Sequence, residues 1–258
     1  MNSRPAYKFY PSLLDAFSDL MDCDQNWEKF YGGSEDPAFS PQEYEQKVER
    51  EFIDKVNRVP FTSEAASKGT AFNEIVDCIL LHVPSTREDC KLTSNRQEGY
   101  ITAQIDGFEF RYSEPLCRLV AKMYEGAIPQ YRLSAMLPTQ YGIVELYGNA
   151  DYLLYDSVHD LKTTKQYDFG KYENHWQRYA YPYCLIESGD YTEVRDFTFD
   201  VLKWTDMDGI LYGEITPETY LYDHRIATAK LTHICEQLIT WLELHRSEIT
   251  DKKVFGGE

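Results

Sequence analysis

Two short apolar runs on either side of a polar pair limit the possible folds of this chain more than any other feature, because they predict a β-hairpin. The segment from Asp151 to Lys162 reads DYLLYDSVHDLK, in which Asp156-Ser157 separates DYLLY from VHDLK. Tyr, Leu and Val favour strands, and a two-residue polar turn between such runs is typical of a hairpin. With that turn, Asp151 faces Lys162, and Asp160 shares their face of the sheet. A slip of one residue would move Asp151 to the opposite face.

Two carboxylates and an ammonium on one face suit a hard divalent cation. Mg²⁺ and Mn²⁺ prefer oxygen ligands and need only a few carboxylates, with waters and substrate phosphate oxygens completing the shell. A metal there lowers the pKa of a bound water and neutralises charge on the phosphoryl group under attack. The lysine could position that water or stabilise the transition state. Taken alone, the pattern fits an ordinary Asp–Lys pair on a surface hairpin equally well.

Four segments along the chain carry a more specific pattern. They read KGTAFNE at 68–74, GNAD at 148–151, HDLKTT at 159–164 and QRYAY at 177–181. In this order they resemble the Gly-Thr-x-x-His helix, the Gly-x-x-Asp strand, the hydrophobic-Asp-x-Lys-Thr strand and the Gln-x-x-x-Tyr helix of the PD-(D/E)xK nuclease superfamily, in its RecB-type and phage-exonuclease-like branch. The likeness covers roughly residues 69 to 181. It departs from the family at Asn73, which stands in the histidine position.

The resemblance implies an α/β fold with a mixed central sheet flanked by helices. The expected core is restriction-endonuclease-like, with elements in the order αβββαβ and with N-terminal helical and hairpin additions. A single domain is expected over 1–258, with the motif core at about 67–204, an N-terminal helical segment at 1–66 and a closing helix at about 223–246. A length of 258 residues fits one large domain.

The resemblance also assigns roles to the motif residues. Asp151 and Asp160 would bind Mg²⁺ or Mn²⁺, and Lys162 would orient the attacking water. Five more residues would support the site and its metal: Gln177, Tyr181, Leu161 through its carbonyl, Asn73 and Glu74. Three cations near the motif would bind substrate: Lys165, Lys171 and Arg178. Without the family, the polar stripe around Asn73 is simply the wet side of a surface helix, and Tyr181 is a core residue.

The function implied is hydrolysis of DNA phosphodiester bonds by a Mg²⁺/Mn²⁺-dependent deoxyribonuclease, an exonuclease of phage or mobile-element type. DNA is the expected partner, with a recombination or replication protein and self-association as further candidates. Two alternatives stay open: a catalytically weak or inactive nuclease-fold protein that binds nucleic acid or a protein, and an RNA-directed nuclease. The net charge of −17 counts against tight nonspecific binding of DNA, because an acidic protein repels a polyanion, and together with Asn73 in the histidine position it favours the non-enzymatic alternative.

Composition narrows the class of protein. With 43% hydrophobic residues the chain can bury a large core. It has no run of 18 apolar residues and no basic segment followed by an apolar run at its N-terminus, so we expect a cytoplasmic protein without a membrane span. The six cysteines show no CxxC pair and no zinc spacing, so we expect reduced thiols and no iron–sulfur cluster.

Periodicity and turn signals place the other elements. Helices are expected at about 13–22, 41–56, 67–82, 114–124, 169–187 and 223–246. Asp106-Gly107 predicts a second, peripheral hairpin that could contact substrate. Strands are expected at about 131–137, 143–147 and 192–202, and residues 84–98 read as a polar connection.

Overall fold

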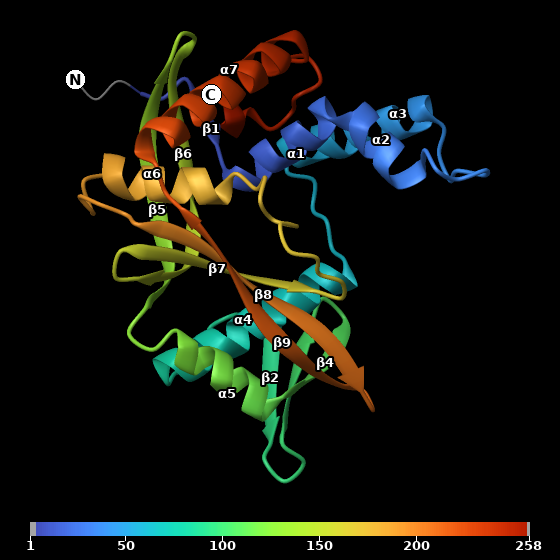
Figure 1. Cartoon of the computed structure of the whole chain (residues 1–258), viewed down its shortest axis with the longest axis vertical. Helices are drawn as coiled ribbons and strands as arrows, with labels where there is room; N and C mark the ends of the chain where they lie inside the picture. The colour runs from blue at the N-terminus through green and yellow to red at the C-terminus, as the bar shows by residue number, and fades with distance from the viewer. Residues whose placement is uncertain (1–3, 257–258) are drawn as a thin grey trace.

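A computed structural model describes residues 4–256, in which one mixed sheet of nine strands is flanked by helices (Figure 1). The predicted domain limits at residues 1 and 258 lie outside the described residues. The strands are β1 (Tyr7–Phe9), β2 (Cys90–Asn95), β3 (Tyr100–Ile105), β4 (Phe108–Ser113), β5 (Ile128–Thr139), β6 (Gly142–Leu154), β7 (Ser157–Thr164), β8 (Asp196–Met207) and β9 (Ile210–Leu221). The helices are α1 (Pro11–Met21), α2 (Cys23–Tyr31), α3 (Pro41–Val56), α4 (Glu64–Leu81), α5 (Glu114–Met123), α6 (Gln177–Glu187) and α7 (His224–Leu244), with a 3-10 turn η1 (Lys252–Phe255).

The sheet runs in the order β1-β6-β7-β8-β9-β4-β3-β2, and β5 also pairs with β6. β5, β6 and β7 form an antiparallel meander, and β8 then lies parallel to β7 after the crossover through α6. The single bridge Tyr112–Leu211 joins β4 to β9, so the predicted peripheral hairpin extends the central sheet. The mixed α/β architecture expected from the sequence is therefore confirmed.

Two hydrophobic cores lie on the sheet. The larger packs α1, α3, α6 and α7 against β5–β8, and the smaller packs α4 and α5 against β2–β4 and parts of β6–β9. In Figure 1, α6 and α7 lie at one end of the sheet and α4 and α5 near the other. α2 and α3 extend to one side. On β7, Val158 belongs to the first core and Leu161 to the second, which shows the alternation of a strand covered on both faces.

The predicted turn of the motif hairpin was wrong by one residue. Leu154 pairs with Ser157, so the turn is Tyr155-Asp156, and Leu153 lies opposite Val158. Tyr155 is 81% exposed with a φ of 54°, whereas Ser157 is buried and donates a hydrogen bond to Asp196. That hydrogen bond lets a polar residue occupy the strand. The pairing moves by two positions, which preserves the face of each side chain.

Other boundaries also differ from expectation. The helix expected at 169–187 begins only at Gln177, and three strands, β1, β2 and β9, and the helix α2 were not predicted. Residues 165–176 instead form an irregular loop. The Tyr167 hydroxyl and the Gly170 backbone N–H of this loop donate hydrogen bonds to Glu218 on β9. In contrast, α3 begins and ends where expected, because Ser40 and Glu43 form a reciprocal capping box at its start.

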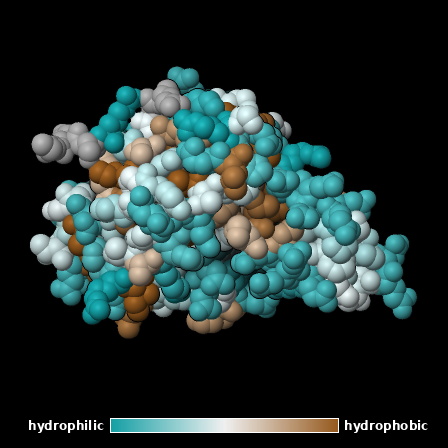
Figure 2. Space-filling view, turned by 90° about the horizontal axis from the view of Figure 1, so that it is seen from above, coloured by the Kyte–Doolittle hydropathy of each residue, from teal (hydrophilic) through white to brown (hydrophobic). Residues whose placement is uncertain are grey.

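The surface reflects the charged composition. Hydrophilic residues cover most of the face seen in Figure 2, with hydrophobic residues gathered near its middle. Within residues 4–256, no helix is both long and apolar enough to cross a bilayer.

Candidate active site

The motif residues meet where two strands separate. β6 and β7 pair only from Tyr152–His159 to the turn, and beyond that point they diverge as a fork, while β7 stays paired with β8 along its whole length. Asp151 and Asp160 are the next residues along each strand, so their side chains lie at the opening of this fork. Alternation along β7 places Asp160 and Lys162 on one face, over which α6 packs.

Asp160, Lys162 and Gln177 form a closed set of polar contacts. Lys162 Nζ lies 2.8 Å from Asp160 Oδ2 and donates to Gln177 Oε1 at 2.6 Å. Gln177 Nε2 in turn donates to Asp160 Oδ1. Burial alone lowers the pKa of Lys162, but the Asp160 and Asp151 carboxylates raise it above its ordinary value. The lysine is therefore a charged donor held in one position.

Asp151 is bound from two sides. Its Oδ2 accepts from the Leu161 backbone N–H at 2.9 Å and from Asn73 Nδ2, on α4, at 3.5 Å. Burial, followed by repulsion from Asp160, raises the pKa of Asp151 to about 8. Two aspartates this close resist ionising together, and a nearby cation relieves that repulsion.

Two motif glycines allow close packing around the site. A Cβ on Gly148 would lie 2.7 Å from Tyr181 Cε1, and one on Gly69 would lie 2.9 Å from Thr163 Oγ1. The first contact lets the Tyr181 ring lie against β6, and the second brings α4 close to β7. Burial, followed by the Asp160 charge, raises the pKa of Tyr181, so the phenol stays protonated. Tyr181 also accepts a hydrogen bond from Gln177 at 3.4 Å.

Helix α1 holds the start of α6, a contact that the sequence did not reveal. Asp15 Oδ1 accepts from the Trp176 backbone N–H at 2.8 Å, and Asp15 Oδ2 lies 3.3 Å from His175 Nδ1. The Trp176 indole N–H also donates to Ser18 at 2.8 Å. Because Gln177 follows Trp176 directly, α1 fixes the position of the side chain that contacts Asp160 and Lys162.

The residues at the fork fit a hard cation. Asn73 Oδ1 is a buried oxygen that has no hydrogen-bond donor within the described part of the chain, whereas the buried Asp160 Oδ2 has the Lys162 ammonium 2.8 Å away as its partner. Buried acceptors of this kind are rare, and a cation is one of the few partners that satisfies them. No group of three or more His, Cys, Asp or Glu residues that could hold a metal occurs in residues 4–256. The candidate donor set is therefore Asp151, Asp160 and the Asn73 amide, all of them oxygen ligands.

Some predicted residues lie elsewhere. Glu74 Oε1 accepts from the Cys78 thiol at 3.7 Å, and no described contact joins Glu74 to either aspartate. The Arg178 guanidinium stacks on Tyr179 and Tyr220, since it lies one position further around α6 than Gln177. The described contacts therefore do not link Arg178 to the site.

The two predicted lysines lie just beyond β7. Lys171 donates to Thr164 Oγ1 at 2.8 Å and to the Gln166 carbonyl at 2.9 Å. Lys165 is exposed. Both therefore lie on the loop between β7 and α6, and Lys171 ties this loop to the end of the strand.

Comparison with known proteins leaves the family open. No protein-family model and no curated protein matches the sequence. Among solved structures, the chain is similar to one titled "Crystal structure of SSO0001", with 12% identity and a TM-score of 0.33, over 48% of this chain and 54% of that one. The chain thus spans about half the length of that protein. A likeness this weak says nothing about fold family or activity.

Proposed function

We propose that this protein is a metal-dependent nuclease that hydrolyses DNA phosphodiester bonds. One observation carries the proposal: Asp151, Asp160, Lys162 and Gln177 converge from β6, β7 and α6 beside the buried Asn73 Oδ1, which has no hydrogen-bond donor among the described residues. Carboxylates with a charged lysine beside them suit hydrolysis of a phosphodiester. A hairpin carrying a simple Asp–Lys pair has no need of the glutamine that binds both partners.

The order of elements supports a restriction-endonuclease-like core. α4 is followed by β5, β6 and β7, then by α6 and β8, which is the order αβββαβ once β2–β4 and α5 are treated as an insertion. The four motif segments fall on α4, β6, β7 and α6. We assign the exonuclease character, of phage or mobile-element type, by family resemblance.

Each residue of the candidate site has its own role in the proposed reaction. Asp151, Asp160 and Asn73 would hold Mg²⁺ or Mn²⁺, with the Leu161 carbonyl as a further ligand, and the metal would supply charge neutralisation and a more acidic bound water. Lys162 presents its ammonium to a water or to a phosphate oxygen. Gln177 restrains Lys162 and Asp160 together, so the donor needs no reorganisation when charge develops on the phosphate. Tyr181 packs behind Gln177 and limits its movement.

The proposed metal site leads to a prediction about metal preference. Its ligands are all oxygens, and only two are carboxylates, so Mg²⁺ and Mn²⁺ should bind weakly to the free protein and more tightly once DNA supplies phosphate oxygens. Titration calorimetry with and without a non-cleavable oligonucleotide measures this difference. Tight binding of Zn²⁺ in the absence of DNA would contradict the assignment.

A cleavage assay tests the function itself. Purified protein should degrade labelled linear DNA with Mg²⁺ or Mn²⁺ and leave it intact in EDTA, while circular DNA should resist if the enzyme requires an end. Single-stranded DNA, duplex DNA and RNA of matched sequence identify the substrate. The competing function is a nuclease-fold binding protein, which is favoured because residues 4–256 contain no cluster of three His, Cys, Asp or Glu side chains suited to a metal. Failure to cleave any of these substrates would contradict the nuclease proposal, and binding of the same oligonucleotides without cleavage would support the alternative.

A further inference from the structure

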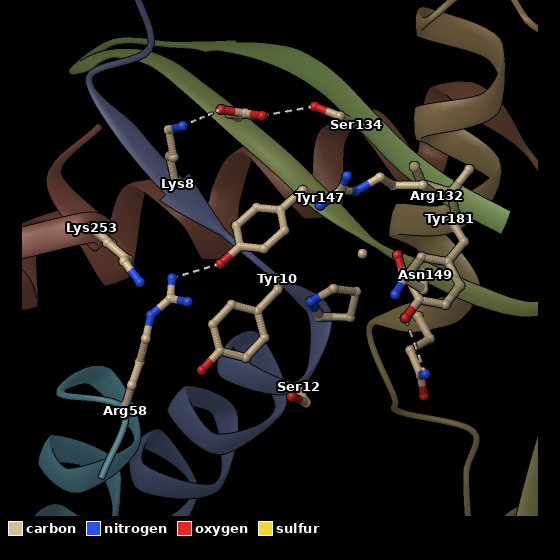
Figure 3. Close-up of a pocket in the computed structure, with 15 residues that line it drawn as sticks. Lys8, Tyr10, Ser12, Arg58, Arg132, Ser134, Tyr147, Asn149, Tyr181 and Lys253 are labelled. Atoms are coloured by element: carbon tan, nitrogen blue, oxygen red, sulfur yellow. Dashed lines mark hydrogen bonds and ion pairs between the residues drawn. The ribbon is translucent and has the colours of Figure 1, made fainter. Parts of the chain in front are cut away.

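A cleft of about 820 Å³ opens beside the candidate site. Gln177 and Tyr181 form part of its wall, so the cleft and the aspartate–lysine cluster share two residues. The rest of its lining comes from β1, β5, β6, η1, the start of α1 and the loop after α3. Figure 3 shows the Tyr10 and Tyr147 rings in its middle, with Arg58 and Lys253 on one side and Arg132 and Tyr181 on the other.

The charge of this cleft is opposite to that of the whole protein. Four cations line it, and one carboxylate, Glu145. Glu145 is already bound, because Lys8 Nζ lies 3.0 Å from it and Ser134 donates to it at 2.9 Å. Within the described residues, neither Arg132 nor Lys253 has an ion-pair partner. In a chain of net charge −17, two unpaired cations facing one cleft indicate an anionic ligand.

Arg58 gives an independent indication. It follows Asn57, the C-cap residue of α3, and has a φ of 54°, in the left-handed region that favours glycine. This conformation is uncommon for a residue other than glycine. The guanidinium donates to the Tyr147 hydroxyl at 2.8 Å and lies 3.3 Å from Asp251, which holds it at the cleft.

The two tyrosines provide aromatic surface next to these cations. The ring centroids of Tyr10 and Tyr147 lie 5.7 Å apart, and the Arg58 guanidinium lies 5.8 Å from the Tyr10 ring. Alternating cations and aromatic rings recognise single-stranded nucleic acid, because the cations contact phosphates while exposed bases stack on the rings. In a duplex the bases already stack on each other.

We propose that this cleft binds a single-stranded stretch of the substrate strand next to the scissile phosphate. Arg132 and Lys253 contact backbone phosphates, and Tyr10 and Tyr147 provide stacking surface for bases. The inference rests on the proposed nuclease function, and it assigns substrate binding to residues that come from four separate parts of the sequence.

The test measures binding of fluorescein-labelled (dT)12 by anisotropy in EDTA. The double variant Arg132→Gln/Lys253→Gln should bind roughly 25-fold more weakly at 0.1 M salt, and its slope of log K against log salt should fall by about 1.4, because each lost phosphate contact removes about 0.7. The control double variant Lys91→Gln/Lys122→Gln changes net charge equally, on exposed sites of β2 and α5, and should stay within about twofold of wild type. An abasic oligomer of equal length should bind wild type about tenfold more weakly.

The outcomes separate this proposal from the nuclease proposal. Equal binding by the cleft variant and the control variant overturns the cleft assignment, while Mg²⁺-dependent cleavage by wild type would still support the nuclease. Weakened binding without any cleavage leaves the cleft standing and refutes the nuclease. Equal binding of the abasic oligomer, or displacement of (dT)12 by poly-glutamate at equal charge, refutes recognition of a nucleic acid strand.

Discussion

Replacing Lys162 by alanine should lower the rate of metal-dependent cleavage about a hundredfold to a thousandfold, which is the usual effect of losing one preorganised donor to the transition state. The variant should still fold, with a lower melting temperature, because Asp160 keeps its hydrogen bond from Gln177 but loses its buried ion-pair partner. Single-turnover cleavage with saturating enzyme measures the chemical step separately from substrate binding.

Two further variants show whether a slower cleavage rate comes from the candidate site or from the change in bulk charge. Lys91→Ala removes an exposed lysine of β2 and should leave the rate unchanged, which controls for bulk charge. Gln177→Ala should also slow cleavage, since it releases both Lys162 and Asp160. A folded Lys162→Ala protein that cleaves at the wild-type rate would exclude the lysine from the chemistry.

The sequence predicted those parts of the site that depend on local spacing. Asp160 and Lys162 lie two apart on a strand, and Gln177 and Tyr181 lie four apart on a helix, so each pair shares a face whatever the remainder of the chain does. The face of Asp151 was also predicted despite the wrong turn residue, because an error of two positions in pairing leaves the face unchanged.

The rest depends on contacts between distant segments. Asp15 reaches Trp176 across 161 positions, and Arg132 and Lys253 line one cleft only because β5 and η1 border it. The hydrophobic periodicity of a sequence does not predict contacts between residues so far apart in the chain. The missed strand β9 has a local cause, since Gly213 and Pro217 look like strand breakers. Near Pro217, β9 pairs only with β8, so the missing N–H on its open side costs no ladder hydrogen bond there.

Replacing Asp151 by asparagine should stabilise the metal-free protein while abolishing cleavage. Burial and the Asp160 charge raise the pKa of Asp151 from 3.8 to about 8. A carboxyl whose folded-state pKa is raised favours folding while it is protonated, so this contribution is full below about pH 4 and is lost as pH rises to about 8. Since one pKa unit corresponds to about 1.4 kcal/mol, the cost at neutral pH is on the order of a few kcal/mol. A neutral asparagine avoids that cost.

An asparagine at position 151 would also have hydrogen-bond partners on both sides. Its carbonyl can still accept from the Leu161 N–H, and its amide can donate to Asn73 Oδ1, which has no donor among the described residues of wild type. Thermal unfolding in EDTA from pH 4 to pH 8 should therefore show the variant gaining several degrees on wild type as pH rises. Added Mg²⁺ should narrow the gap, because it stabilises only the protein that binds it. A variant that melts below wild type at pH 8 would mean that Lys162 already compensates the Asp151 charge, and that the fork is a closed ion-pair network rather than a metal site.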